Sequence, residues 1–248
     1  MSKSILNNND TIQKVIEVYK QAENRTTDIY SEILGVKILN LAGVFSPVDF
    51  PADPALISTQ VFAKALPEIV KNSSLLEIGS GTGIISLCVA LKSTNPENIL
   101  ASDINPKAVE NTRLNFENHD LPCQTRQSDL FDQVKESQKF DFIFWNHPFF
   151  DLDVSTFITN QAIASGGFDY NYSSLERYLK DAARHLTKKG RMLLGTNLDV
   201  GNWSKIVEIS QKYDWKSYKI IYSESVLSYV DKEIDTNLVI VEFLKDQF

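Results

Sequence analysis

Apolar and polar residues follow one another in an order that predicts strands alternating with helices over most of the chain. Short, almost wholly apolar runs are typical of strands buried on both faces of a parallel sheet. Apolar residues three and four positions apart, in the segments between these runs, are typical of covering helices. The predicted strands are residues 75–78, 98–102, 123–127, 140–145, 191–195, 215–222 and 237–244, and the predicted helices are 84–91, 106–118, 173–186 and 203–213. This alternation predicts an α/β fold, a doubly wound sheet with strand 140–145 at its centre.

Residues 151–172 form the longest connection between these elements. Because the segment is long and holds Gly166-Gly167, we expect a mobile functional loop there. Ser173 and Glu176 have the spacing of a capping box that would begin the next helix. Gly190 is placed to end that helix.

The N-terminal part has a different pattern. Residues 11–34 have helical spacing that weakens near 24–27, which predicts one or two helices after a disordered start at 1–10. Residues 36–45 predict a strand or a hairpin with Gly43 in its turn, and 46–54 hold three prolines and predict an extended segment. A further helix is expected over 55–70, broken at Pro67. We therefore divide the chain into an N-terminal helical and hairpin cap, 1–45, and a main domain, 46–248. The cap could simply pack on the main domain, or it could act as a lid or a substrate-recognition element.

The first chemical signal lies where strand 75–78 ends, in Glu77-Ile78-Gly79-Ser80-Gly81-Thr82-Gly83. A strand, a glycine turn and a helix bring backbone N–H groups to one point at a helix N-terminus. Only glycine lets a ligand lie directly on such a turn, because a Cβ would fill the space. A dinucleotide turn would place its third glycine or alanine at position 84, where this chain has isoleucine. The spacing therefore argues against a nicotinamide-dependent oxidoreductase.

The order Glu-x-Gly-x-Gly-x-Gly after a strand resembles motif I of class I S-adenosylmethionine-dependent methyltransferases. The resemblance implies a Rossmann-like sheet of seven strands, mostly parallel with the last antiparallel. It also implies that S-adenosylmethionine binds at the turn from Gly79 through Ser80, Gly81 and Thr82 to Gly83. Glu77 would help to hold the methionine end, or would serve only as a hydrogen-bonding group of a buried turn.

Two aspartates follow the next strands. Asp103 ends strand 98–102, where a carboxylate can accept both hydroxyls of a ribose, cap the following helix, or do both. The resemblance implies that Asp129, after Ser128, accepts a hydrogen bond from the adenine amino group. Ile104 or Leu130 would contact the adenine ring. The alternative for Asp129 is an exposed aspartate in a turn.

The second chemical signal is Asn146-His147-Pro148-Phe149, directly after the predicted central strand. It resembles the Asn-Pro-Pro-Tyr/Phe motif of methyltransferases that act on nitrogens of planar groups. The Asn146 side chain and the His147 backbone carbonyl would accept the two N–H groups of an amide or exocyclic amine, and Phe149 would stack on the planar group. Pro148 would stiffen the turn. The His147 side chain, where those families have proline, could accept a proton, contact substrate or merely fill space.

The wider resemblance is to the HemK-type protein-glutamine N-methyltransferases and the "methyltransferase small" families. Val44-Phe45-Ser46-Pro47 resembles the segment that precedes motif I there and covers the cofactor, so Phe45 is an expected cofactor contact. The resemblance implies that the methyl acceptor is an amide of a protein, such as a translation factor. A base of ribosomal or transfer RNA, a small molecule, and a non-catalytic nucleoside-binding module stay open as alternatives.

The composition gives only slight evidence on which class of methyl acceptor the protein uses. The chain of 248 residues has a formal net charge of −7, so it has no general basic surface for a nucleic-acid backbone. Two cysteines give no disulfide framework, and the first ten residues lack the apolar core of a secretory signal. We expect a cytoplasmic enzyme without a membrane span and without a metal ion.

Overall fold

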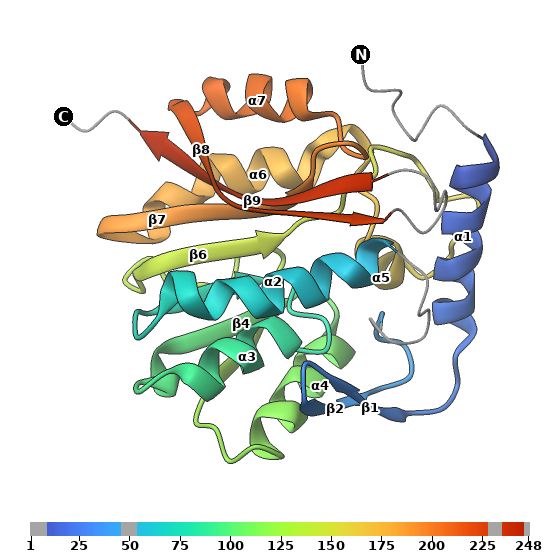
Figure 1. Ribbon diagram of the computed structural model, residues 1–248, viewed down its shortest axis with the longest axis horizontal. Coiled ribbons are helices and arrows are strands. Elements are labelled where there is room, and N and C mark those ends of the chain that lie inside the picture. Colours follow the sequence, from blue (N-terminus) through green and yellow to red (C-terminus); the bar gives the residue numbers. More distant parts are fainter. Residues whose placement is uncertain (1–8, 46–53, 228–234, 246–248) are drawn as a thin grey trace.

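A seven-stranded sheet forms the centre of the protein (Figure 1). The computed structural model describes residues 9–45, 54–227 and 235–245. The strands of this sheet are β3 (Leu75–Ile78), β4 (Ile99–Asp103), β5 (Gln124–Gln127), β6 (Phe140–Asn146), β7 (Leu186–Asn197), β8 (Trp215–Leu227) and β9 (Asp235–Lys245). Their order is β5-β4-β3-β6-β7-β9-β8, with β9 antiparallel to both of its neighbours. The expected Rossmann-like sheet is confirmed, including the central place of β6.

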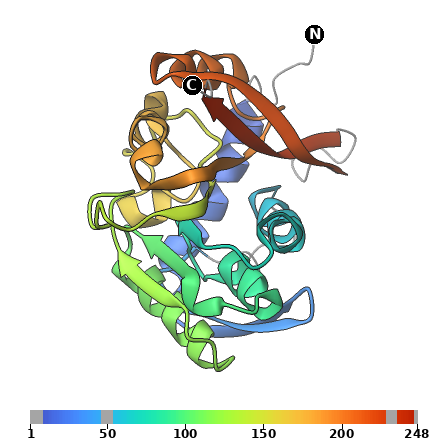
Figure 2. The same cartoon turned by 90° about the vertical axis from the view of Figure 1, so that its left-hand side faces the viewer.

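Helices cover both faces of the sheet. Neighbouring residues of a strand point to opposite faces, and in the inner strands both sets of side chains are apolar and have to be buried. Leu75 of β3 packs with the helices of one face, and Leu76 packs with those of the other. The first face carries α2 (Pro54–Val70), α3 (Ile84–Lys92) and α4 (Pro106–Glu117), and the second carries α6 (Ser173–Asp181) and α7 (Trp203–Lys212). Figure 2 shows α2 (teal) and α6 (tan) on opposite sides of the twisted sheet. The strands are therefore buried twice, which explains their continuous apolar runs.

The N-terminal cap differs from its prediction. Helix α1 (Asn9–Asn24) is followed by an antiparallel hairpin of β1 (Ile29–Ile33) and β2 (Val36–Asn40), so the second predicted helix is wrong. The hairpin turns at Leu34 and Gly35, whose φ angles are +53° and +77°, and not at Gly43. Two successive positive φ angles fit a two-residue hairpin turn.

Helix α1 stands across the edge at which the parallel strands end (Figure 1). It contacts the short helix α5 (Gln161–Ala164), which lies in the connection between β6 and α6. In doubly wound sheets this edge is where ligands bind. The cap is therefore placed over the expected site.

Two helices also differ from their predictions. Helix α2 continues through Pro67 to Val70, so the predicted break is wrong; the Pro67 carbonyl still accepts a bond from the Lys71 N–H at 3.0 Å. The predicted helix over 173–186 ends at Asp181, a 3₁₀ turn follows, and Gly190 lies inside β7 rather than ending a helix.

The predicted capping box at Ser173 and Glu176 is also wrong. The Asp169 carboxylate accepts the N–H groups of Ser174 and Leu175, each at 2.9 Å. Glu176 instead accepts bonds from Lys212, the last residue of α7, and from Tyr213, which caps that helix. The predictions of disorder at 1–10 and of an extended segment at 46–54 fall almost wholly outside the described residues.

Candidate functional site

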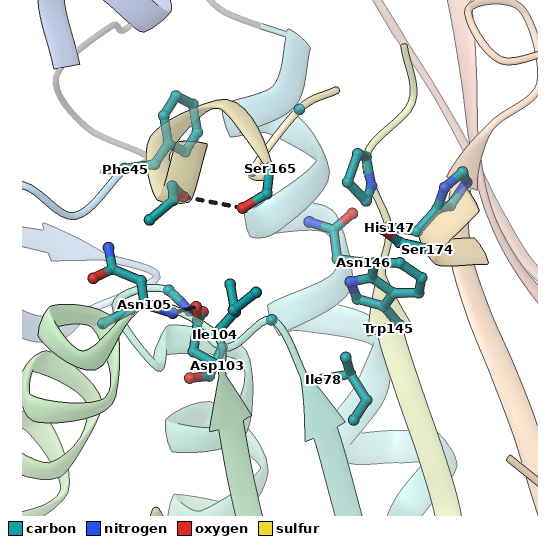
Figure 3. Close-up of a pocket in the computed structure, with 18 of the residues that line it drawn as sticks. Phe45, Ile78, Asp103, Ile104, Asn105, Trp145, Asn146, His147, Ser165 and Ser174 are labelled. Atoms are coloured by element: carbon teal, nitrogen blue, oxygen red, sulfur yellow. Dashed lines mark hydrogen bonds between the residues drawn. The ribbon is translucent and has the colours of Figure 1, made fainter. Parts of the chain in front are cut away.

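A pocket opens at the ends of β3, β4, β5 and β6, under the N-terminal cap (Figure 3). It brings together every site residue predicted from the sequence except Gly83. These residues are Phe45, Glu77, Gly79, Ser80, Gly81, Thr82, Asp103, Ile104, Ser128, Asp129, Leu130, Asn146, His147, Pro148 and Phe149. Segments far apart in the sequence meet here because parallel strands end at one edge of the sheet.

The backbone of the turn requires glycine at three positions, and the surroundings of Gly81 and Gly83 differ. All have positive φ, +67° at Gly79, +57° at Gly81 and +81° at Gly83. A Cβ on Gly83 would lie 2.7 Å from Thr112 Cγ2, so Gly83 allows the turn to pack on α4. A Cβ on Gly81 would meet no atom of the described residues within 4 Å, so Gly81 keeps space open in the pocket. The turn thus has one glycine for packing and one that leaves a cradle for a ligand.

Hydrogen bonds hold the turn in this shape. The Ser80 N–H donates to the Ser102 carbonyl at 3.0 Å, and the Ser80 and Thr112 hydroxyls lie 3.0 Å apart. Thr112 also donates to the Gly81 carbonyl at 3.2 Å, and the Asn115 amide donates to the Thr82 carbonyl at 2.8 Å. The cradle is therefore formed before any ligand arrives, which lowers the entropy cost of binding.

Asp103 lies beside the cradle. One carboxylate oxygen accepts the Gly81 N–H at 2.8 Å, and the other accepts the Asn105 N–H at 2.9 Å. Burial raises the pKa of Asp103. Each oxygen keeps a free lone pair, which suits a diol such as that of a ribose. The alternative role as helix cap falls to Asn105, whose side chain accepts the Lys107 N–H at 3.0 Å.

Glu77 is buried, with 2% of its surface exposed. Its carboxyl group accepts the Ser86 N–H at 3.0 Å and the Ser86 hydroxyl. Burial raises its pKa to about 8. The side chain therefore joins β3 to the first turn of α3. This geometry favours the hydrogen-bonding role within a buried turn over direct contact with a ligand.

The turn after β5 forms the far end of the pocket. The Ser128 hydroxyl donates to the Leu130 carbonyl at 2.9 Å, and the Leu130 side chain is buried. Ile104 is 47% exposed and faces the same pocket. Asp129 lies in an ion pair with Arg177 of α6, in which one guanidinium nitrogen is 2.8 and 2.9 Å from its two oxygens. No local pattern in the sequence could have shown this contact.

Asn146 ends β6 at the centre of the site. Its amide nitrogen donates to the Ser58 hydroxyl of α2 at 3.4 Å. Its amide oxygen is buried, and none of the described residues donates a hydrogen bond to it. Figure 3 shows this amide in the pocket, across from the end of β4. A buried acceptor without a partner is costly unless a ligand supplies the donor.

His147 projects to the other side of its strand (Figure 3). Its side chain is buried, and Nε2 lies 2.8 Å from the Thr196 hydroxyl. Burial lowers the pKa of His147 to about 3, so the imidazole is neutral. Its position favours the space-filling role over proton transfer. Phe149, 5.7 Å from the imidazole between ring centres, lines the pocket with Pro148.

An aromatic wall closes the pocket on the cap side, in which the predicted Phe45 is joined by Tyr19 and Phe168, which the sequence analysis did not predict. The Phe45 ring stacks on Tyr19 of α1 at 4.6 Å, and Phe168 meets Tyr19 edge-on at 4.9 Å. A Cβ on Gly167 would lie 2.0 Å from the Tyr19 hydroxyl. Gly167 is thus needed for this contact, and the segment expected to be a mobile loop packs against α1.

The charge of the pocket is acidic. Among its described lining residues the carboxyl groups are Glu77, Asp103 and Asp129, of which Glu77 keeps its proton at neutral pH. His147 is neutral, and the described lining holds no lysine or arginine. The described residues also contain no group of three or more His, Cys, Asp or Glu suited to a metal ion. The open cradle at Gly81 and the acidic lining fit a cationic nucleoside.

Comparisons with known proteins show what the chain is similar to. Residues 35–218 match the model of the methyltransferase small domain. A candidate protein N5-glutamine methyltransferase of Methanocaldococcus jannaschii is 33% identical over 163 residues, which are 64% of this chain and 75% of that protein. The ribosomal RNA small subunit methyltransferase C of Haemophilus influenzae is 24% identical over 68% of this chain and 44% of that protein.

A release factor glutamine methyltransferase of Streptococcus pneumoniae is 27% identical over 50% of this chain and 45% of that protein. Among solved structures, a 16S rRNA N2 G1207 methyltransferase of T. thermophilus, in complex with AdoMet and guanosine, superposes with a TM-score of 0.60. It is 19% identical and covers 89% of this chain and 50% of that chain, so the likeness concerns the fold. The chain thus spans about half the length of these last relatives.

Within the described residues, no helix is both long and apolar enough to cross a membrane.

Proposed function

The chain belongs to the methyltransferase small domain family, and from this premise we propose that it methylates the nitrogen of a neutral planar group, with a protein glutamine amide as the favoured acceptor. It is an S-adenosylmethionine-dependent methyltransferase. The cofactor supplies the methyl group as part of a sulfonium cation, and an acidic pocket suits that charge.

The proposed contacts follow the order of the strands. The turn from Gly79 to Gly83 holds the middle of the cofactor, with Gly81 against it. Asp103 accepts the ribose hydroxyls. Ile104 and Leu130 contact the adenine ring, and Asp129 accepts from its amino group while Arg177 holds the carboxylate in place.

The observation that carries the proposal is the buried amide oxygen of Asn146, to which no group in the described part of the chain donates a hydrogen bond. An amide or exocyclic amine is a weak nucleophile, because its lone pair is delocalised into the planar group. When Asn146 Oδ1 and the His147 carbonyl accept its N–H bonds, the nitrogen lone pair is directed at the methyl group. Pro148 and Phe149 fix the plane of the acceptor. Orientation of this kind accounts for a large part of catalysis in methyl transfer.

The lining of the acceptor side favours a protein amide. Around Asn146 the pocket is lined by aromatic and small neutral residues, including Phe45, Ser58 and Phe168, which suits an uncharged group. An RNA acceptor would need cations for its phosphates, and the lining has none. The alignment with the candidate glutamine methyltransferase covers 75% of that protein. An exocyclic amine of an RNA base is the second candidate, because ribosomal RNA methyltransferases are also among the relatives.

The test uses the full chain, labelled S-adenosylmethionine and a cell lysate. We expect label in the protein fraction, in a form that protease removes and ribonuclease does not. Asn146→Ala should lower this labelling about 10²- to 10³-fold, the usual loss when one oriented polar group is removed from a site. Its affinity for S-adenosylhomocysteine, measured by calorimetry, should stay within a few-fold of the wild type.

Asn118→Ala is the matched control, because Asn118 is exposed at the end of α4 and lies outside the pocket. It should change neither labelling nor affinity. Label confined to RNA would exclude the protein acceptor and favour the second candidate. Full labelling by Asn146→Ala would contradict the proposed mechanism.

A further inference from the structure

Trp145 places an indole ring in the pocket beside the glycine turn. It precedes Asn146 on β6 and pairs in register with Ile78 of β3. Its side chain is 6% exposed, and the residue lines the pocket. The sequence motif that drew attention to this strand begins one residue later, so it gave Trp145 no role.

The indole N–H has no acceptor among the described residues. An indole nitrogen can only donate, and this one is not among the fully buried unpaired atoms of the described residues, so it stays accessible from the pocket that Trp145 lines. Trp215, the comparable buried tryptophan, donates to the Leu179 carbonyl at 2.7 Å. Trp145 Nε1 instead faces Gly79, where an added Cβ would lie only 3.0 Å away. Figure 3 shows the nitrogen edge of this ring turned toward the glycine turn.

The side of the sheet indicates which part of a ligand lies next to this donor. Trp145 belongs to the same buried cluster as Ile78 and Leu130, next to the turn after β5. Asn146 points to the opposite side, toward Ser58 of α2. Two consecutive residues of β6 therefore serve different parts of the pocket, with Trp145 on the side of Leu130.

We propose that Trp145 is a cofactor-binding residue, whose N–H donates to a ring nitrogen or ribose oxygen of the cofactor nucleoside. The inference rests on the proposed function, since it takes the pocket to hold S-adenosylmethionine. The donor gives the site a way to recognise the nucleoside without a cation. The indole also offers the nucleoside an apolar surface.

The first test compares Trp145→Phe with the wild type by calorimetry. Phenylalanine keeps an aromatic ring and removes the donor. We expect S-adenosylhomocysteine and adenosine to bind about 2- to 10-fold more weakly, by a similar factor for both, as when one hydrogen bond is lost. Trp215→Phe is the matched control, because it removes a buried indole N–H outside the pocket. It should leave both affinities unchanged.

The second test uses fluorescence and does not depend on Trp145→Phe folding well. The chain has three tryptophans, so Trp203→Phe with Trp215→Phe leaves Trp145 as the single one. Adenosine should change the emission of this variant in a saturable manner, at the concentrations that give half-saturation in calorimetry.

The outcomes separate this inference from the proposed function. If wild-type protein binds neither S-adenosylhomocysteine nor adenosine, the proposed function fails and this inference fails with it. If the wild type binds both and Trp145→Phe binds them equally well, only this inference is overturned. If Trp145→Phe binds S-adenosylhomocysteine more weakly but binds adenosine as tightly as the wild type does, the Trp145 N–H does not contact the nucleoside, and the inference is overturned.

Discussion

Gly81 and Gly83 stand two residues apart in one turn, yet alanine should have different effects at the two positions. At Gly83 the new Cβ would lie 2.7 Å from Thr112 Cγ2 and 2.9 Å from Thr112 Oγ1. At Gly81 it would meet no atom within 4 Å in the part of the chain that the structure describes. We therefore expect Gly83→Ala to damage the fold, and Gly81→Ala to damage cofactor binding.

The magnitudes follow from the backbone and the contacts. A positive φ costs alanine about 1–2 kcal/mol relative to glycine, which applies at both positions. Overpacking a rigid contact adds about 1–3 kcal/mol, and this applies only to Gly83. We expect Gly83→Ala to lower the free energy of unfolding by about 2–5 kcal/mol and Gly81→Ala by about 1–2 kcal/mol. Gly35→Ala is the matched control for strain, since Gly35 has φ +77° and open space in the hairpin turn.

Urea denaturation measures these stabilities, and calorimetry with S-adenosylhomocysteine measures the affinity. The affinity should fall at least about 10-fold in Gly81→Ala, because the methyl group occupies the cradle, and should not change in Gly35→Ala. Adding Thr112→Ser to Gly83→Ala removes the nearest methyl group and should recover part of the lost stability beyond additivity.

Two results would refute this reasoning. If Gly83→Ala costs no more stability than Gly35→Ala, the contact with Thr112 does not explain the glycine. If Gly81→Ala binds S-adenosylhomocysteine as the wild type does, the turn is not the surface on which the cofactor lies.

The remaining predictions concern the pH dependence of the free energy of unfolding, to which the buried side chains of Glu77 and His147 contribute in opposite directions. The pKa of Glu77 is about 8 in the folded chain, against an ordinary 4.5. Between these values the folded state holds a proton that the unfolded chain has released, so this group lowers stability as pH rises. Glu77→Gln, which can still accept the Ser86 N–H, should show a smaller fall in the free energy of unfolding from pH 5 to pH 8; an unchanged slope in urea denaturation would contradict the buried carboxyl. The pKa of His147 is about 3 when folded, against an ordinary 6.5, so this group lowers stability as pH falls through that window. His147→Gln should be less sensitive to acid between pH 6 and pH 4, and a wild-type imidazole that titrates near 6.5 by NMR would refute its burial.

The glycine turn and the strand ends were predictable because their signals are local. Gly79, Gly81 and Asp103 each follow a strand, and parallel strands bring their ends to one edge whatever the packing. The contact between Asp129 and Arg177 joins residues 48 positions apart, and no spacing rule reports it. The contact of Tyr19 with Gly167 is likewise a product of tertiary packing.

The errors in the prediction have the same origin. Ile29, Ile33 and the residues around them satisfy a helical spacing, but their burial follows a two-residue period for most of the strand. Pairing with β2 decided between the two periods, and pairing is not visible in a single segment. Similarly, Ser173 has the right spacing for a cap, but Asp169 lies closer to the first N–H groups of α6 once the chain has turned.

One face of α4 links the two halves of the pocket. Asn115 bonds the N–H and carbonyl groups of Leu39 at 2.7 and 2.8 Å, and also the carbonyl of Thr82 in the glycine turn. Asn105, the cap of the same helix, donates to the Gly43 carbonyl at 3.0 Å, two residues before Phe45. The cradle and the chain that carries the aromatic wall therefore take their positions from one helix. Because an α-helix is rigid over this length, a shift of the cradle would carry the base of the wall with it.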